Sequence, residues 1–266
     1  MSEPGLFRRQ GEIFTPTPLA AGPWDPGLLH GGSTAGLLAF ALESALNPEQ
    51  RFARLTCELF RPVPMTELRL ETRVIRNGRR AGVVEAWIYA DSTPVARGVG
   101  LSVRREAALE IPAAAAAPLA PPEPQLTGAS LGGWDQVPFA GGEAGLAAAI
   151  EVRLLSPMDF SGAGEAWIRF TGAVVIDAPL SPFVYAATLS DFGNGFGQLV
   201  LANGTGFINA DITMHLLEDP APGSWLRIQA QTTVGSHGAG FTQSRFFQER
   251  LCASVTQVVT PQRLMG

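Results

Sequence analysis

The stretch Ser181-Pro-Phe-Val-Tyr-Ala-Ala-Thr-Leu-Ser-Asp191, followed by Phe-Gly-Asn-Gly, decides the fold. Pro182 suits the first turn of a helix, where a missing N–H group loses no hydrogen bond. Apolar and small side chains surround this predicted helix, so we expect the protein to wrap it on all sides. Asp191, its only carboxylate, falls near the helix C-terminus, where the helix dipole disfavours negative charge. Asp191 is therefore either a residue of the following turn or a carboxylate kept for function.

A second apolar helix is predicted from Thr34 to Leu46, ending before Pro48. Four strand candidates follow it, at residues 54–60, 67–76, 83–90 and 94–103. One helix followed by an antiparallel meander makes this half of the chain α+β.

The composition excludes several classes of protein. The chain has 266 residues, enough for one large or two ordinary domains, and 46% of them are hydrophobic. A net charge of −5 argues against nucleic acid or a membrane surface as partner. Cys57 and Cys252 are far apart in apolar runs, and no signal peptide precedes them, so we expect reduced thiols and a cytoplasmic protein. The histidines lack metal-ligand spacing, so we expect no metal site.

The chain divides at a Pro/Ala-rich stretch. Residues 107–127 have few groups that would anchor a core, and we interpret them as an extended linker. This predicts an N-terminal unit at residues 1–106 and a C-terminal unit at residues 128–266.

The second unit repeats the first. At a constant offset of 158 positions, the pair Leu226-Arg227 falls on Leu68-Arg69 and Ala239-Gly240 falls on Ala81-Gly82. A gap of one residue then brings Gln257 onto Gly100. In the helices, an offset of 148 brings Ser181 onto Ser33 and Asp191 onto Glu43. We predict two units with joined sheets and an internal pseudo-twofold.

Three segments resemble the double-hotdog acyl-CoA thioesterases, a family similar to bacterial acyl-CoA thioesterase II. The segments are Leu189-Ser-Asp191-Phe, Asn209-Ala-Asp211-Ile-Thr-Met214 and Leu251-Cys-Ala-Ser-Val-Thr-Gln257. The resemblance implies a tandem double hotdog, in which each repeat wraps an antiparallel sheet around a central apolar helix. It also implies hydrolysis of acyl-CoA, with Asp191, Asn209 and Gln257 as the hydrolytic residues.

The residue types fit that chemistry. A thioester has a good leaving group, so its hydrolysis needs a positioned water and a polarised carbonyl. Asp191 would activate the water as general base, and the amides of Asn209 and Gln257 would hold it or the carboxylate. No cofactor is expected, because coenzyme A is part of the substrate.

His30-Gly31-Gly32, before the first helix, also occurs in hotdog thioesterases. There, backbone N–H groups at the helix mouth point at the thioester oxygen, and glycines allow its close approach. A simple turn is an equal alternative. Single-hotdog enzymes carry a carboxylate nine residues after the His, where this chain has Ala39. This difference favours one site shared between the halves, while Glu43 leaves a second site in the first repeat open.

Two other classes of function stay open. Hydratase hotdogs use an Asp and a His five residues apart, the spacing of Asp25 and His30. A non-catalytic acyl-CoA or lipid-binding protein is the third class. In all three, we expect a homodimer or higher homo-oligomer, because hotdog sheets leave usable edges and faces.

Overall fold

A computed structural model describes the chain except residues 1–3, 24, 108, 121–132, 134–143 and 264–266. The first half begins with a hairpin, continues with a short 3-10 helix and the helix α1, and ends with four strands. These elements are β1 (Gly5–Gln10), β2 (Ile13–Pro16), η1 (Pro18–Ala20), α1 (Gly31–Glu43), β3 (Gln50–Leu59), β4 (Leu68–Asn77), β5 (Ala81–Ala90) and β6 (Thr93–Arg104).

The second half follows a similar order, with a hairpin, helices and then a meander. Its elements are η3 (Gly145–Ala149), β7 (Ile150–Leu154), β8 (Ala163–Phe170), β9 (Ala173–Val175), α2 (Pro182–Leu189), α3 (Phe192–Phe196), β10 (Thr205–Asn209), β11 (Asp211–Leu216), β12 (Leu226–Val234), β13 (Gly240–Phe247) and β14 (Leu251–Arg263).

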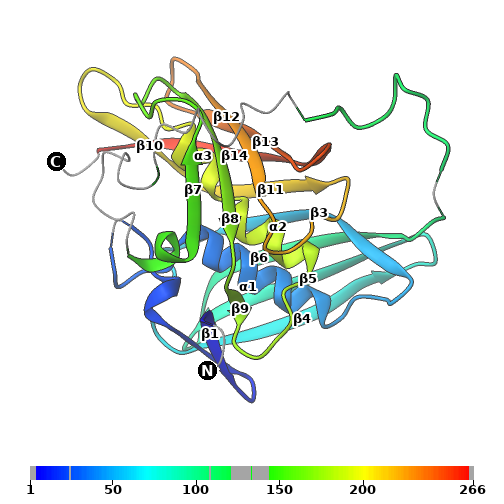
Figure 1. Cartoon of the computed structure of the whole chain (residues 1–266). Coiled ribbons are helices and arrows are strands. Elements are labelled where there is room, and N and C mark those ends of the chain that lie inside the picture. The colour runs from blue at the N-terminus through cyan, green and yellow to red at the C-terminus, as the bar shows by residue number, and fades with distance from the viewer. Residues whose placement is uncertain (1–3, 24, 108, 121–132, 134–143, 264–266) are drawn as a thin grey trace.

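The described strands form one sheet in the order β7-β8-β12-β13-β14-β11-β3-β6-β5-β4-β2-β1-β9, with β10 paired to β14. The halves meet where β3 and β11 pair antiparallel, with Thr56 opposite Thr213. The sheets of the two halves therefore join side by side, which confirms that part of the sequence prediction. Figure 1 shows α1 and α2 at the centre of the molecule, enclosed by the strands.

The strand register supports the offsets found in the sequence. In the first half Arg69 pairs with Tyr89, and in the second half Arg227 pairs with Phe247, so both strands are shifted by 158 positions. Val84 pairs with Gly100, as Thr242 pairs with Gln257. The last strand is therefore shifted by one position fewer, which is the gap the sequence required. Gln257 and Gly100 occupy equivalent places in the two meanders.

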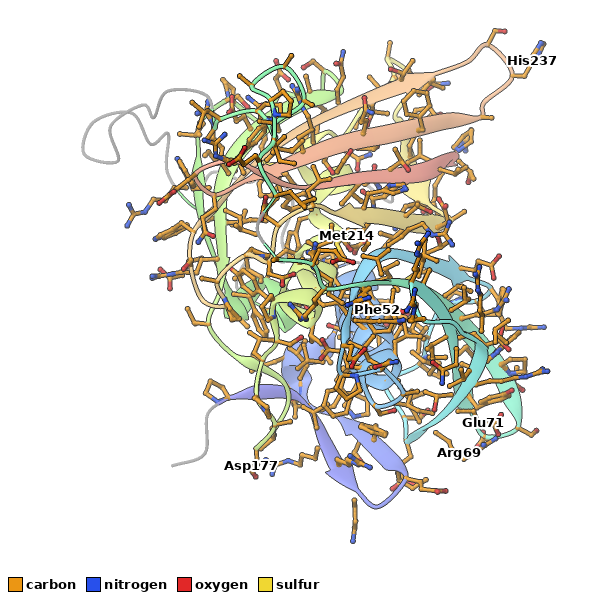
Figure 2. The ribbon with its side chains drawn as sticks, turned by 90° about the vertical axis from the view of Figure 1, so that its right-hand side faces the viewer. Phe52, Arg69, Glu71, Asp177, Met214 and His237 are labelled. Carbon is orange, nitrogen blue, oxygen red and sulfur yellow. The ribbon has the colours of Figure 1, made fainter. Side chains whose placement is uncertain are left out.

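Both long helices are buried, because sheet and helix surround them on all sides. Leu37, Leu38 and Leu42 of α1 are 0% exposed, and burying each such side chain stabilises the fold by about 1.5–3 kcal/mol. Figure 2 shows Phe52 of β3 and Met214 of β11 on the helix side of the sheet, where both are buried.

The helix boundaries differ from the sequence prediction. α1 begins at Gly31 rather than Thr34, with His30 as its N-cap residue, and it ends at Glu43. Ser181 caps α2 through a hydrogen bond from the N–H of Val184, 3.1 Å long. The residue equivalent to Ser181 is therefore His30 and not Ser33, so the offset of 148 is wrong at the helix starts.

Part of the predicted linker is described. Leu119 forms an isolated antiparallel bridge with Arg250, and the N–H of Ala120 donates to the carbonyl of Glu249. Residues 121–127 lie outside the described part of the chain, so the linker and the unit boundaries at 106 and 128 stay predictions. None of the described helices has the length and apolar character needed to cross a membrane.

Candidate active site

Asp191 lies between α2 and α3 and points at the N-terminus of α1. Its Oδ2 is 2.9 Å from His30 Nδ1 and accepts the N–H of Gly32 at 3.0 Å. The positive end of the α1 dipole therefore faces this carboxylate. Our expectation of an unfavourable dipole considered only α2, the helix that precedes Asp191, and did not include the favourable end of α1.

The Asp191 contact selects a tautomer of His30. Nδ1 lies 3.0 Å from the N–H of Gly32 and 2.9 Å from Asp191 Oδ2. One ring nitrogen carries either a proton or a lone pair, and the adjacent carboxylate favours the proton. Nδ1–H therefore donates to Asp191, and the Gly32 N–H donates to the same oxygen. No residue that the structure describes bonds Nε2.

Asn209 and Gln257 bind the other carboxylate oxygen. Asn209, the last residue of β10, donates its Nδ2 to Asp191 Oδ1 at 2.8 Å. Gln257 of β14 is 0% exposed and donates its Nε2 to the same atom at 3.3 Å. The structure thus brings together all three residues that the resemblance selected, although they come from a helix junction and two different strands.

These contacts decide the charge of Asp191. Burial by itself raises its pKa, but the hydrogen bond and charge of His30, followed by the hydrogen bonds from Asn209 and Gly32, outweigh burial. The pKa of Asp191 is consequently held below its ordinary value, and its carboxylate is ionised at neutral pH.

The two glycines are needed for this approach. A Cβ on Gly31 would lie 2.6 Å from Asp191 Oδ2 and 2.7 Å from its Cγ, closer than real Cβ contacts. A Cβ on Gly32 would collide with the backbone oxygen of Thr188 in α2. His30-Gly31-Gly32 is therefore a helix start that only glycine allows to pack against the α2–α3 junction, and not a simple surface turn.

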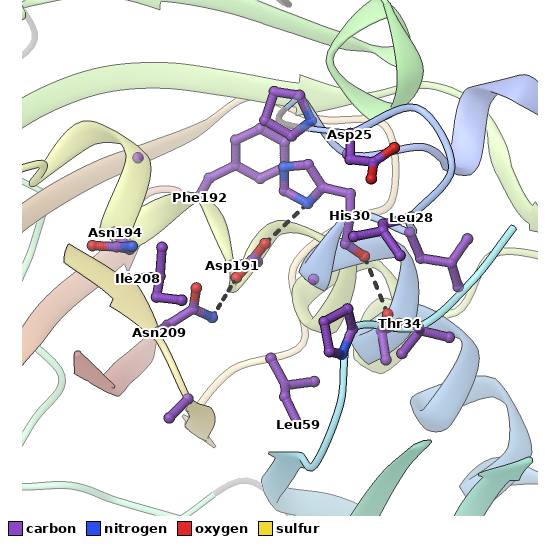
Figure 3. Close-up of a pocket in the computed structure, with 18 of the residues that line it drawn as sticks. Asp25, Leu28, His30, Thr34, Leu59, Asp191, Phe192, Asn194, Ile208 and Asn209 are labelled. Carbon is purple, nitrogen blue, oxygen red and sulfur yellow. Dashed lines mark hydrogen bonds and ion pairs between the residues drawn. The ribbon is translucent and has the colours of Figure 1, made fainter. Parts of the chain in front are cut away.

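A cavity of about 480 Å³ opens beside Asp191 and His30. Its apolar walls include Leu28, Leu29, Leu59, Val63, Met158, Phe192, Phe196 and Ile208. Figure 3 shows Asp191 between Asn209 and His30, with Phe192 above the imidazole. The rings of Phe192 and His30 are stacked, with centroids 5.0 Å apart. This volume and lining are typical of a pocket for a small, largely apolar ligand.

The other candidates lie apart from this group. Asp25 borders the cavity, but its carboxylate accepts the N–H of Gly27 at 2.7 Å and is exposed. Glu43 does not line this cavity and accepts the hydroxyl of Ser181 at 2.8 Å. No group of His, Cys, Asp and Glu residues in the described part of the chain is arranged to hold a metal ion.

The sequence analysis missed Asn194 and Phe192. Both line the cavity from α3, a segment whose glycines suggested only a turn. A signal was present, because Phe192-Gly-Asn-Gly-Phe-Gly197 places large residues between glycines directly after the candidate carboxylate Asp191.

Comparisons with known proteins agree with this geometry. Residues 20–103 match the family model for the acyl-CoA thioesterase N-terminal domain, and residues 115–260 match that for the C-terminal domain. No curated protein matches the sequence.

Solved structures resemble the whole chain. A conserved protein of unknown function with a hot dog fold from Alicyclobacillus acidocaldarius has a TM-score of 0.70 at 20% identity, covering 97% of this chain and 96% of that one. Acyl-CoA thioesterase II TesB2 from Mycobacterium marinum has a TM-score of 0.64 at 15% identity, covering 97% and 95%. The TesB protein of Mycobacterium avium subspecies paratuberculosis has a TM-score of 0.65 at 14% identity, covering 96% and 95%. At these identities the likeness shows the hotdog fold, and the matched family models show that this protein belongs to the acyl-CoA thioesterase family and is a thioesterase.

Proposed function

We propose that this protein is a tandem double hotdog that hydrolyses acyl-CoA to a free acid and coenzyme A at a single site shared by its halves. The observation that carries the proposal is the ionised Asp191, bonded to His30 of the other half beside an apolar cavity. The matched strand registers and the equivalent helix caps support the tandem repeat.

In the proposed reaction, water attacks the thioester carbonyl and the thiolate leaves. Asp191 has four protein donors on its two oxygens, which lower its own basicity. We therefore assign the transfer of the water's proton to the Asp191–His30 pair. His30 Nε2 accepts the proton, while Asp191 holds Nδ1–H and stabilises the imidazolium. Asn209 and Gln257 fix the carboxylate.

The carbonyl oxygen needs a donor as charge develops on it. The Gly32 N–H is bonded to Asp191, so it does not serve this purpose. We assign the role to the N–H of Gly31, which lines the cavity at the N-terminus of α1. The protein needs no cofactor in this scheme, and we propose that it works in the cytoplasm as a homodimer or higher homo-oligomer.

The hydratase alternative has weaker support. It requires Asp25 and His30 to act together, whereas His30 bonds Asp191 and Asp25 closes its own turn with Gly27. A binding protein without activity would not require the ionised carboxylate and histidine pair beside the cavity.

One assay series separates the three classes. Acyl-CoA and enoyl-CoA substrates of increasing chain length are mixed with the protein, and thiol release and enoyl absorbance are followed. Hydrolysis predicts thiol release at one range of chain lengths, with a loss of roughly 10²–10⁴-fold in turnover for His30→Gln. Asp25→Asn is the matched control and should hydrolyse normally. Loss of enoyl absorbance without thiol, or binding without either signal, would overturn the proposal.

A further inference from the structure

The amide of Gln257 is fixed in one orientation. Its Oε1 accepts the backbone N–H of Asn194 at 3.0 Å. A backbone N–H can only donate, so the oxygen must face α3 and Nε2 must face Asp191. Because Gln257 is 0% exposed, water does not compete for either atom. The position of α3 therefore decides where Gln257 points its N–H groups.

α3 is in turn tied to the strand that carries Asn209. The Asn194 side chain is 8% exposed and donates its Nδ2 to the carbonyl of Phe207 at 3.2 Å. Gln198 donates its Nε2 to the same carbonyl at 3.3 Å. Phe207 lies in β10, two residues before Asn209. One carbonyl thus binds both the middle of α3 and the segment just after it, two residues before Asn209.

α3 packs tightly against the neighbouring strands. A Cβ on Gly193 would lie 2.8 Å from Gln257 Oε1 and 2.5 Å from Ser244 Oγ. On the same side, Thr232 donates its hydroxyl to the carbonyl of Gly197 at 2.6 Å. A shift of α3 would therefore be transmitted to Gln257 rather than absorbed by neighbouring space.

We infer that Asn194 is a positioning residue, which holds α3 on β10 so that the Gln257 amide meets the Asp191 oxygen that Asn209 also binds. This inference rests on the proposed function. Asn194 acts through Gln257 and needs no contact with the substrate. The amide-to-carbonyl hydrogen bond is the part of Asn194 that does this, so a side chain without a donor cannot replace it.

A double-mutant cycle in turnover tests the inference. Asn194→Ala is expected to lower kcat by about 10- to 100-fold, with KM changed by no more than about twofold, because misplacement affects the reacting geometry more than binding. In the Gln257→Ala background the same substitution should cost less than about twofold. Asn203→Ala is the matched control: Asn203 is exposed, accepts the N–H of Thr205 in a loop, and should leave kcat unchanged.

Gly193→Ala supplies a second route if Asn194→Ala folds poorly in thermal melts. Its Cβ would press on the Gln257 Oε1, and its loss of kcat should also vanish in the Gln257→Ala background. Equal losses of kcat in both backgrounds would mark a general structural effect and overturn the inference, as would normal kcat for Asn194→Ala beside an impaired Gln257→Ala. Normal thiol release by Gln257→Ala alone would instead refute the role that the proposed function gives to Gln257.

Discussion

Asp191 and Glu43 lie at opposite ends of the α1–α2 pair, and each faces the residue that caps the other helix. Asp191 meets His30 and the N–H of Gly32, and two amides complete its shell. Among the described residues, the Ser181 hydroxyl is the only group that donates a hydrogen bond to Glu43. The pKa of Asp191 is lowered by its donors despite burial, whereas burial raises the pKa of Glu43. Equivalent carboxylates thus differ because of the donors around them.

The strands behind the two carboxylates differ in the same sense. Gln257 in β14 has Gly100 as its equivalent in β6. A Cβ on Gly100 would lie 2.5 Å from the Phe52 ring, and Phe52 stacks on Phe183 with centroids 4.6 Å apart. Phe183 is the second residue of α2, as Gly32 is of α1. An aromatic pair therefore fills the place where the other end has a donor group, which supports the proposal of one site per chain.

The largest difference between Asp191 and Glu43 is expected in their effects on turnover. Asp191→Asn should lower kcat by roughly 10²–10⁴-fold, because the amide cannot hold His30 Nδ1–H as a carboxylate does. Glu43→Gln should hydrolyse within about twofold of the unmodified protein, since Glu43 lies outside the cavity. Thiol release under saturating substrate measures both. Inactive Glu43→Gln with active Asp191→Asn would move the active site to the first repeat.

The next comparison is between Phe52, which stacks on Phe183, and Phe192, which stacks on His30. Phe52→Ala should lower the free energy of unfolding by about 3–5 kcal/mol, because it leaves a cavity where Phe52 packs against Phe183. The kcat of the folded variant should stay unchanged. Phe192→Ala removes the ring that stacks on His30, so kcat should fall as well as stability. Denaturant titrations and thiol release on the same preparations check this pair. A larger loss of kcat in Phe52→Ala than in Phe192→Ala would contradict the proposal that the active site lies at Asp191 rather than at Glu43.

The third effect concerns the helix starts. Gly31→Ala should lower kcat by about 10- to 100-fold, because its Cβ would displace the Asp191 carboxylate. The matched substitution is Pro182→Ala at the first position of α2, which adds an N–H and removes no contact with Asp191, so kcat should stay unchanged. Normal turnover by Gly31→Ala would show that the carboxylate can move without loss.

Much of this comparison was predictable, because it depends on local patterns. The two wholly apolar helices required an enclosing sheet, and constant offsets between strands required a joined repeat. Asp191, Asn209 and Gln257 were selected through three short segments that resemble the thioesterase family. The favourable helix dipole at Asp191 was not predictable, since it comes from α1, whose Gly32 lies 159 positions earlier in the chain. Asn194 was missed for the same reason, because its role depends on a carbonyl in β10 and an amide in β14.

The smallest effect is the pH dependence of stability, where the two carboxylates should have opposite signs. The folded pKa of Asp191 lies below its ordinary 3.8, so its carboxylate stabilises the fold above that pH and this contribution is lost as pH falls through the folded pKa.

At pH 7, Asp191→Asn should therefore lower the free energy of unfolding by about 1–3 kcal/mol, because its NH₂ group faces donors and leaves them unsatisfied. The folded pKa of Glu43 lies above its ordinary 4.5, so its charge destabilises the fold as pH rises past 4.5. Glu43→Gln should then raise the free energy of unfolding at pH 7 by about 0.3–1 kcal/mol, the size of a charge effect at a helix C-terminus. Both differences should shrink toward strongly acidic pH. Denaturant titrations between pH 3 and pH 7 measure them, and equal signs at pH 7 would mean that the two ends are electrostatically alike.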